Sequence, residues 1–186
     1  VDRRQALSQW NQLKSTLESH GVKVFVVPPV EEQPGLVFPA NAGFRYRDDF
    51  YLSNLNPARG REREHYRKVI SSLGLTVRDF PSSVPFEGVY PFEGEADFIP
   101  MGDPSGDPER KVFLFTYGRI ERKRWLPRFG FPPYRRVYGF RSDRRILPTL
   151  QQIALAREIL PLELVDEFHY HGDTVLCPFG PNSEHL

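Results

Sequence analysis

The sequence predicts an α/β fold in which one helix and a few short strands form a repeated unit. Apolar residues recur at helical spacing in three separate segments of the 186-residue chain. Each helical segment is followed by a short apolar run, which is typical of a strand. Further strand-like segments lie between these units. A unit that recurs in this way indicates a repeat architecture, whose core forms between successive units.

The first unit begins with a predicted helix over Arg3–His20, and Gly21 ends it. The continuous apolar run Val22–Val27 then predicts a buried strand. The helix has one apolar face. That face consists of Ala6, Trp10, Leu13 and Leu17.

The second unit has a predicted helix over Arg61–Leu73, which Gly74 ends, and a strand over Leu75–Phe80. The third has a predicted helix over Pro148–Ile159, since proline suits the first helical turn, and a strand over Leu162–Phe168. The apolar faces of the two helices are Tyr66, Val69, Ile70 and Leu73, and Leu150, Ile153, Ala154 and Leu160. Other short strands are expected at Gly43–Tyr46, Phe50–Ser53, Phe92–Ile99, Val112–Tyr117 and Thr174–Pro178.

Length and charge fit a single soluble domain over residues 1–186. The 25 basic and 24 acidic residues balance, so the charge implies no general attraction to nucleic acid or to a membrane surface. No apolar run reaches the roughly 18 residues that a membrane span needs. The lone Cys177 excludes an internal disulfide. It fits a reducing compartment, either the cytoplasm or the mitochondrial matrix.

An insertion rich in proline, glycine and arginine interrupts the third unit at about residues 100–137. Met101–Arg110 is typical of a surface turn. Arg119–Arg136 mixes basic and aromatic residues, which can bind RNA or an acidic protein surface or form a plain loop. We favour a protein partner over nucleic acid. We expect the segment to be ordered only against such a partner or further parts of the fold, with Trp125 and Phe131 as anchors.

Two short motifs concentrate the titratable residues. In Phe92–Phe98 (FEGEADF), strand alternation would place three carboxylates on one face, namely Glu93, Glu95 and Asp97. In His169–Thr174 (HYHGDT), the same alternation would align His169, His171 and Asp173. Such a pair of strands could hold a planar cation and move a proton beside it. The alternative is a set of charges that face solvent, and we predict no metal site because a fourth ligand is lacking.

Several motifs resemble the guanidine-modifying enzymes of the pentein fold, which include arginine and dimethylarginine hydrolases, arginine deiminases and amidinotransferases. The motifs that carry the resemblance are PPV at 28–30, FPANAG at 38–43, YLSNLNPARGREREHY at 51–66, FEGEAD at 92–97, YGFRSD at 138–143 and LELVDEFHYHGDTVLCP at 162–178. The resemblance implies a pseudo-fivefold α/β propeller. The three units would then be about three of five blades, so the domain would be incomplete.

The resemblance also implies roles for individual residues. His171 would be the general acid and base, and either Glu93 or Glu95 the catalytic carboxylate. The substrate-binding residues would be Asn41, Asp97, Asp173 and Arg141. An arginine-like guanidinium is the implied substrate, and the chemistry requires no metal or other cofactor.

The family's nucleophilic cysteine lies in a later blade, and Cys177 matches a structural position instead. The chain alone is therefore expected to release no product from arginine. Two interpretations stay open. The chain is the N-terminal part of a hydrolase or amidinotransferase, or it is a catalytically inactive subunit of a larger assembly, for which the mitochondrion is one candidate location. In both cases we expect a protein partner or C-terminal blades to complete it.

Overall fold

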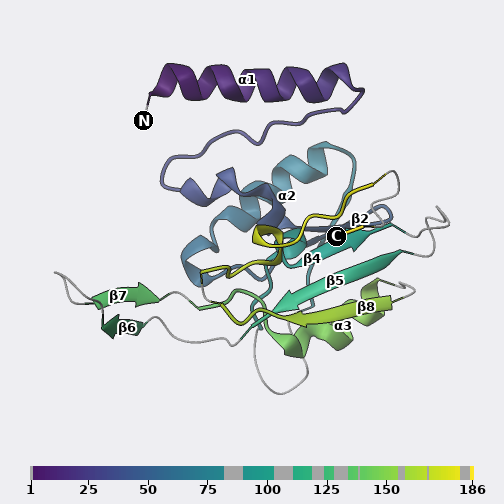
Figure 1. Ribbon diagram of the computed structural model, residues 1–186. Coiled ribbons are helices and arrows are strands. Elements are labelled where there is room, and N and C mark those ends of the chain that lie inside the picture. Colours follow the sequence, from purple (N-terminus) through teal and green to yellow (C-terminus); the bar gives the residue numbers. More distant parts are fainter. Residues whose placement is uncertain are drawn as a thin grey trace.

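The computed structural model describes residues 2–81, 90–102, 111–118, 124–127, 134–137, 139–154, 158–166, 168–180 and 185–186. These residues form a mixed α/β structure with two three-stranded sheets and one two-stranded sheet (Figure 1). Short 3-10 helices connect the main elements: η1 (Pro34–Val37), η2 (Pro39–Ala42), η3 (Pro57–Arg59), η4 (Gly94–Ala96), η6 (Arg144–Ile146) and η7 (Gly172–Thr174). None of the helices in the described ranges is both long and apolar enough to cross a membrane.

The first sheet has the order β1 (Gly43–Tyr46), β2 (Asp49–Leu52) and β3 (Thr76–Asp79). Strands β1 and β2 form an antiparallel hairpin, whereas β2 and β3 are parallel. A parallel pair needs a crossover connection, and helix α2 (Glu62–Ser72) provides it. The predicted second helix and its following strand are thus present, each within one residue of its predicted bounds.

The second sheet repeats this connectivity with β4 (Phe98–Met101), β5 (Val112–Tyr117) and β8 (Glu158–Glu163). Strands β4 and β5 are antiparallel, β5 and β8 are parallel, and helix α3 (Leu147–Ile153) lies in the crossover. Strand β5 matches its predicted bounds. The repeated unit is therefore two antiparallel strands, a helix and a parallel strand, and it occurs twice in the described part of the chain.

The predicted first unit, at the N-terminus, is incomplete in this structure. Helix α1 (Arg3–Ser19) is present and Asp2 caps its first turn. However, Val22–Val30 is irregular, so the predicted strand over Val22–Val27 is wrong. No described strand pairs with this segment, and an isolated strand cannot satisfy its backbone groups. A three-bladed propeller is not confirmed, because the described residues contain the repeated unit only twice and both of its three-stranded sheets are open.

Four other predicted elements differ from the structure. The strand predicted at Leu162–Phe168 begins earlier, as β8 (Glu158–Glu163), and residues 164–166 have no regular structure. The third helix ends at Ile153, and Leu160, assigned to its apolar face, lies in β8. Short apolar runs fit a helix or a buried strand equally well, which explains the error. Thr174–Pro178 forms the end of η7 and irregular chain rather than a strand. Phe92–Ile99 is also not one strand, since η4 separates Phe92 from β4.

The insertion is partly regular. Strands β6 (Arg124–Pro127) and β7 (Tyr134–Val137) form an antiparallel pair. This part of the segment, predicted to be irregular, is therefore paired as a two-stranded sheet. The expected surface turn within Met101–Arg110 lies largely outside the described residues, since only Met101 and Gly102 are described there.

The main core is aromatic and lies between the two sheets. Phe44 of β1 is fully buried and contacts the rings of Phe80, Phe92 and Phe98, with ring centroids 5.0 to 6.4 Å apart. Leu150 of α3 belongs to the same buried cluster. Aromatic pairs at this spacing stabilise one another beyond the burial of their area. This core fixes the segment 92–98 against β1, and so fixes the motif that carries the carboxylates.

Helix α1 contributes no residue to the buried core, because none of its residues is buried against the described part of the chain. Figure 1 shows it along one side of the molecule, away from the sheets.

Leu13 is 60% exposed, so we expect Leu13→Ala to change the free energy of unfolding by less than about 0.5 kcal/mol. Ile70→Val, in the buried face of α2, should cost about 0.5–1.5 kcal/mol. Urea unfolding measures both, and a loss above about 1 kcal/mol for Leu13→Ala would contradict the exposed placement of α1.

Candidate active site

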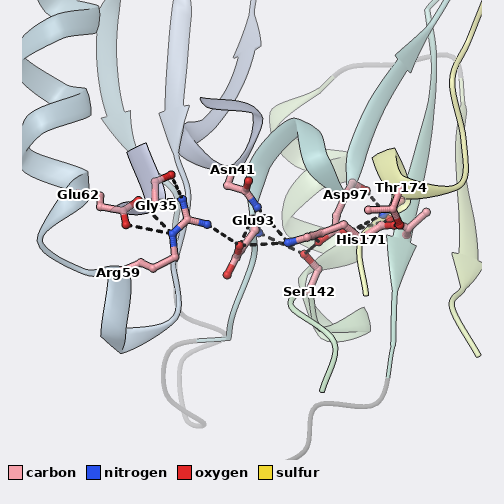
Figure 2. Close-up of polar contacts among 11 residues, drawn as sticks. Gly35, Asn41, Arg59, Glu62, Glu93, Asp97, Ser142, His171 and Thr174 are labelled. Carbon is pink, nitrogen blue, oxygen red and sulfur yellow. Dashed lines mark hydrogen bonds and ion pairs between the residues drawn. The ribbon is translucent and has the colours of Figure 1, made fainter. Parts of the chain in front are cut away.

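Four polar side chains from separate segments meet in the interior of the molecule. Asn41 comes from η2, Glu93 and Asp97 flank η4, and His171 precedes η7. All four are at most 7% exposed. Figure 2 shows them in one continuous row of polar contacts that extends to Arg59. Buried polar groups persist only when they are paired, so this cluster is a built feature of the fold.

The turn at Gly94 determines which carboxylates enter the cluster. Gly94 has φ +56°, which favours glycine, and a Cβ there would meet the backbone of Gly43. The resulting 3-10 turn brings Glu93 and Asp97 to the same side. Glu95 is exposed and accepts a hydrogen bond from the backbone N–H of Arg45 at 3.3 Å. The expected strand face with three aligned carboxylates is therefore wrong, because a 3-10 turn does not alternate as a strand does.

His171 lies between the two inward carboxylates. Its Nδ1 is 3.1 Å from Oδ2 of Asp97, and its Nε2 is 3.4 Å from Oε2 of Glu93. Nε2 is also 3.0 Å from Nδ2 of Asn41. Each ring nitrogen therefore has its own carboxylate, and both contacts favour the imidazolium form.

Asp97 is held by donors on both of its oxygens. Oδ2 accepts a hydrogen bond from Ser142 Oγ at 2.6 Å, beside its contact with His171. Oδ1 accepts from Thr116 Oγ1 at 2.9 Å and from the backbone N–H of Gly172 at 3.0 Å. Asp97 itself is 1% exposed. With this many donors the carboxylate is fixed in position and can orient the ring of His171.

Glu93 has a different environment, open to the pocket on one side. Its Oε2 accepts a hydrogen bond from Asn41 Nδ2 at 2.8 Å and contacts Nη1 of Arg59 at 3.3 Å. The Arg59 guanidinium is held in turn by Glu62 at 2.8 Å and by the carbonyl oxygen of Gly35 at 2.8 Å. One oxygen of Glu93 thus faces an amide, a guanidinium and the imidazole.

These contacts shift the pKa values of the central pair in opposite directions. Burial alone would raise the pKa of Glu93, but the hydrogen bond and charge of His171, with Arg59 and Arg141, hold it below its usual range. Burial alone would lower the pKa of His171, but the hydrogen bonds and charges of Asp97 and Glu93 raise it to about 9. At neutral pH the site therefore holds an imidazolium between two carboxylates.

The raised pKa of His171 predicts how stability depends on pH. Because the folded pKa of about 9 exceeds the usual value of 6.5, the stabilisation is fully present below pH 6.5 and is lost as the pH rises through about 9. At about 1.4 kcal/mol per pKa unit, we expect the free energy of unfolding to fall by about 3 kcal/mol over this range. Urea unfolding at several pH values measures it. His171→Asn should remove this fall, and an unchanged fall in that variant would contradict the assignment to His171.

A pocket of about 470 Å³ opens over this cluster. Asn41, Arg59, Glu93 and His171 line it, and so do Gly35, Phe38, Asn56, Ala58, Arg141, Tyr170, Asp173 and Thr174. The guanidinium of Arg141 lies 5.3 Å from the ring centroid of Tyr170 at its wall. Burial raises the pKa of the Asp173 carboxyl, as does the charge of Asp97, and His171 opposes this. The pocket thus combines carboxylates and cations around one imidazole.

The predicted site residues fall into three groups according to their positions in the structure. Asn41, Glu93, Asp97 and His171 contact one another. Asp173 and Arg141 line the same pocket. Glu95 lies outside the pocket lining, whereas Glu93 lies within it. His169 also turns away, with its ring 3.5 Å from Asp166, so the expected alignment of His169 with His171 is wrong. The described residues contain no group of three or more His, Cys, Asp or Glu placed to hold a metal ion.

Three residues of the site were not predicted as such. Arg59 belongs to the NPARGR sequence, where its loop position before a helix gave no sign of Glu93. Ser142 and Thr116 are hydroxyl residues in unrelated segments, and only the fold brings them to Asp97. Arg59 lies within the motif at 51–66 and Ser142 within the motif at 138–143, but neither motif specified a partner for these residues.

Comparison with known proteins shows that the chain is similar in sequence to arginine-modifying enzymes. No family model matches it. It is 33% identical over 96% of its length to the bifunctional arginine dihydrolase/ornithine cyclodeaminase AgrE of Nostoc sp.. It is 30% identical over 94% of its length to ArgZ, of the same description, from Synechocystis sp.. It is also 27% identical, over 95% of its length and 46% of that protein, to an N(G),N(G)-dimethylarginine dimethylaminohydrolase of Mycobacterium tuberculosis.

Solved structures show the same similarity. The N-terminal domain of ArgZ, bound covalently to a reaction intermediate, matches with a TM-score of 0.67 and 26% identity over 96% of this chain and 53% of that chain. AgrE in complex with L-arginine matches with a TM-score of 0.69 and 29% identity over 97% of this chain and 22% of that chain. The chain spans about 20% of the length of AgrE and ArgZ. None of these relatives is described as a structural subunit or a mitochondrial protein.

Proposed function

We propose that this chain, whose homologues are arginine dihydrolases and a dimethylarginine dimethylaminohydrolase and whose fold is consistent with the pentein family, forms the histidine- and carboxylate-bearing part of a guanidine hydrolase. One observation carries the proposal. His171 is buried at the pocket between Glu93 and Asp97, with one carboxylate on each ring nitrogen. The proposed substrate is an arginine-like guanidinium, as the arginine complex of AgrE suggests.

A guanidinium is a planar cation with a poorly electrophilic carbon, so the enzyme must both bind it and polarise it. Carboxylates bind it through charge-assisted hydrogen bonds to its N–H groups. Glu93 faces the pocket and keeps a lowered pKa, so its carboxylate is ionised at neutral pH. Asp173 lies in the same lining and supplies a second acceptor. In this proposal Glu93 is the principal contact with the substrate guanidinium.

The proposed reaction has two steps. In the first, a cysteine thiolate from another segment of the enzyme attacks the guanidinium carbon. The bond from that carbon to the leaving nitrogen then breaks, and this nitrogen takes its proton from the His171 imidazolium and leaves as ammonia or an amine. A covalent thiouronium remains on the cysteine.

In the second step, water attacks the same carbon while neutral His171 accepts one of its protons. The carbon–sulfur bond then breaks while the hydroxyl proton of the tetrahedral adduct passes to the released ammonia or amine or to solvent, which releases the thiolate and a ureido product. Asp97 keeps the imidazole in orientation in both steps through its contact with Nδ1, so that Nε2 carries the transferred proton. The raised pKa of His171 suits the first step, since the proton donor is present at neutral pH.

The test is turnover of arginine and of N(G),N(G)-dimethylarginine by the natural-length protein. We expect release of ammonia or dimethylamine with formation of a ureido product, and inactivation by a thiol-alkylating reagent. Cys177 is exposed and does not line the pocket. Cys177→Ala should therefore retain both turnover and sensitivity to alkylation.

Two results would overturn this proposal. The first is a wild-type protein that hydrolyses neither guanidine at any pH between about 6 and 10. The mechanism requires protonated His171 and ionised Glu93, and this range covers both. The second is turnover that thiol alkylation leaves unchanged, because the thiolate is the proposed nucleophile. Loss of turnover in Cys177→Ala alone would place the nucleophile in this chain and contradict the assignment made here.

A further inference from the structure

Ser142 connects Asp97 with the backbone of Glu93, the two residues whose carboxylates flank His171. Its hydroxyl donates a hydrogen bond to Oδ2 of Asp97 at 2.6 Å. Oγ of Ser142 in turn accepts a hydrogen bond from the backbone N–H of Glu93 at 3.2 Å. Ser142 is 1% exposed, so water has little access to compete for either hydrogen bond. Figure 2 shows it directly beside Glu93 and His171.

The backbone of Ser142 is fixed from two directions. Its carbonyl oxygen accepts a hydrogen bond from the N–H of Gly118, just after β5, at 3.3 Å. The N–H of the following residue, Asp143, donates to the carbonyl oxygen of Pro91 at 3.0 Å. Ser142 is therefore held between the end of β5 and the segment that leads into Glu93. A hydroxyl held in this way keeps a constant position relative to both carboxylates.

This arrangement closes a ring of contacts. Ser142 contacts Asp97, Asp97 contacts Nδ1 of His171, Nε2 of His171 contacts Glu93, and the N–H of Glu93 returns to Ser142. The two carboxylates bind opposite nitrogens of one rigid ring, so their separation determines how well both contacts are made. The short η4 turn alone connects them along the chain, and Ser142 adds a second connection.

We propose that Ser142 is a positioning residue of this site, which sets Glu93 and Asp97 at the separation that His171 requires. The effect of Ser142 on turnover rests on the proposed function. Its effect on the separation of Glu93 and Asp97 does not. Ser142 does not touch the pocket space that a substrate would occupy, since it is absent from the described lining. It acts through the backbone of Glu93 and the carboxylate of Asp97.

Thr116 provides a matched control. It is fully buried, and its hydroxyl also donates to Asp97, at 2.9 Å on the other oxygen. In the described structure no hydrogen bond connects Thr116 with Glu93. Thr116→Val and Ser142→Ala thus each remove one hydroxyl from Asp97, but only the second removes a partner of Glu93. Their difference isolates the link between the two carboxylates.

The first readout is nuclear magnetic resonance of the natural-length protein, with labelled backbone amides and histidine rings. In Ser142→Ala we expect the amide resonance of Glu93 to move and the titration midpoint of His171 to fall by at least about one pH unit. In Thr116→Val the Glu93 amide should keep its wild-type position. Ser142→Thr keeps the hydroxyl and should restore the His171 midpoint to within about half a unit of wild type.

The second readout is kinetic. For Ser142→Ala with arginine we expect kcat to fall by about tenfold or more, while KM changes by less than about threefold. The alkaline limb of the pH profile should move to lower pH together with the His171 midpoint. A residue that only supports folding would lower the amount of active protein without moving this limb.

The inference is overturned if Ser142→Ala and Thr116→Val show the same Glu93 amide position and the same His171 midpoint. If Ser142→Ala does not fold, Ser142→Cys is compared with Thr116→Val in its place, since its thiol keeps the size and weakens both hydrogen bonds. Absence of turnover in the wild-type protein would refute the proposed function. The resonance comparison would then still decide the role of Ser142.

Discussion

His171→Asn is expected to lower kcat of the natural-length protein for arginine by about 10²–10⁴, the usual contribution of a general acid–base group. The proposed mechanism has no other described proton carrier between Glu93 and Asp97. Asparagine keeps a polar side chain that can still meet Asp97, so most of the fold should survive. Steady-state kinetics with detection of released ammonia measure the effect.

The neighbouring histidine is a natural control for this variant. His169 lies two residues away, its side chain is 41% exposed, and its contact is with Asp166 rather than with the cluster. His169→Asn should therefore leave kcat within about twofold of wild type, as expected for a surface substitution. Equal losses in the two variants would show that the effect is not specific to His171 and would contradict its assigned role.

Asp97→Ala is expected to lower the free energy of unfolding by about 3–5 kcal/mol. The substitution leaves the buried imidazolium of His171 without its partner at Nδ1. It also leaves three hydrogen-bond donors unpaired, from Ser142, Thr116 and Gly172. Unpaired buried donors lose their solvation without compensation, which makes the removal of one partner costly. Urea unfolding at neutral pH measures the loss.

Asp79→Ala is the matched surface control. Asp79 also accepts from two cations, Arg63 at 2.7 Å and Arg67 at 2.6 Å, but its side chain is 63% exposed. Water replaces the lost contacts there, so we expect a change within about 1 kcal/mol. If Asp97→Ala cost no more than Asp79→Ala, the buried network around Asp97 would not contribute to stability as described.

Local sequence pattern predicted much of the secondary structure. Helices α1 and α2 were predicted to within one residue at each end, because apolar spacing and the following glycines mark helix ends clearly. Strands β1 and β5 were predicted with their full bounds. The prediction was wrong where one local pattern suits two structures, as in the apolar run that became β8.

The segment 92–98 shows the limit of strand alternation as a guide to a site. Alternation grouped Glu93, Glu95 and Asp97, whereas the structure groups Glu93 with Asp97 only. The reason is the positive φ of Gly94, which the close approach of Gly43 requires. Such an approach depends on packing between distant segments, so the sequence of the motif does not reveal it.

The sequence by itself therefore determined the repeated α/β unit, the residue types of the site and the motifs that resemble guanidine-modifying enzymes. These properties are local, since they depend on the order and spacing of neighbouring residues. Only the tertiary structure decided that Arg59 reaches Glu93 and that Ser142 and Thr116 hold Asp97. It also decided that Val22–Val27 has no strand partner among the described residues. The pairings of Arg59, Ser142 and Thr116 are contacts between segments far apart in the chain, and a strand partner for Val22–Val27 would be another. Such contacts are fixed by packing rather than by spacing.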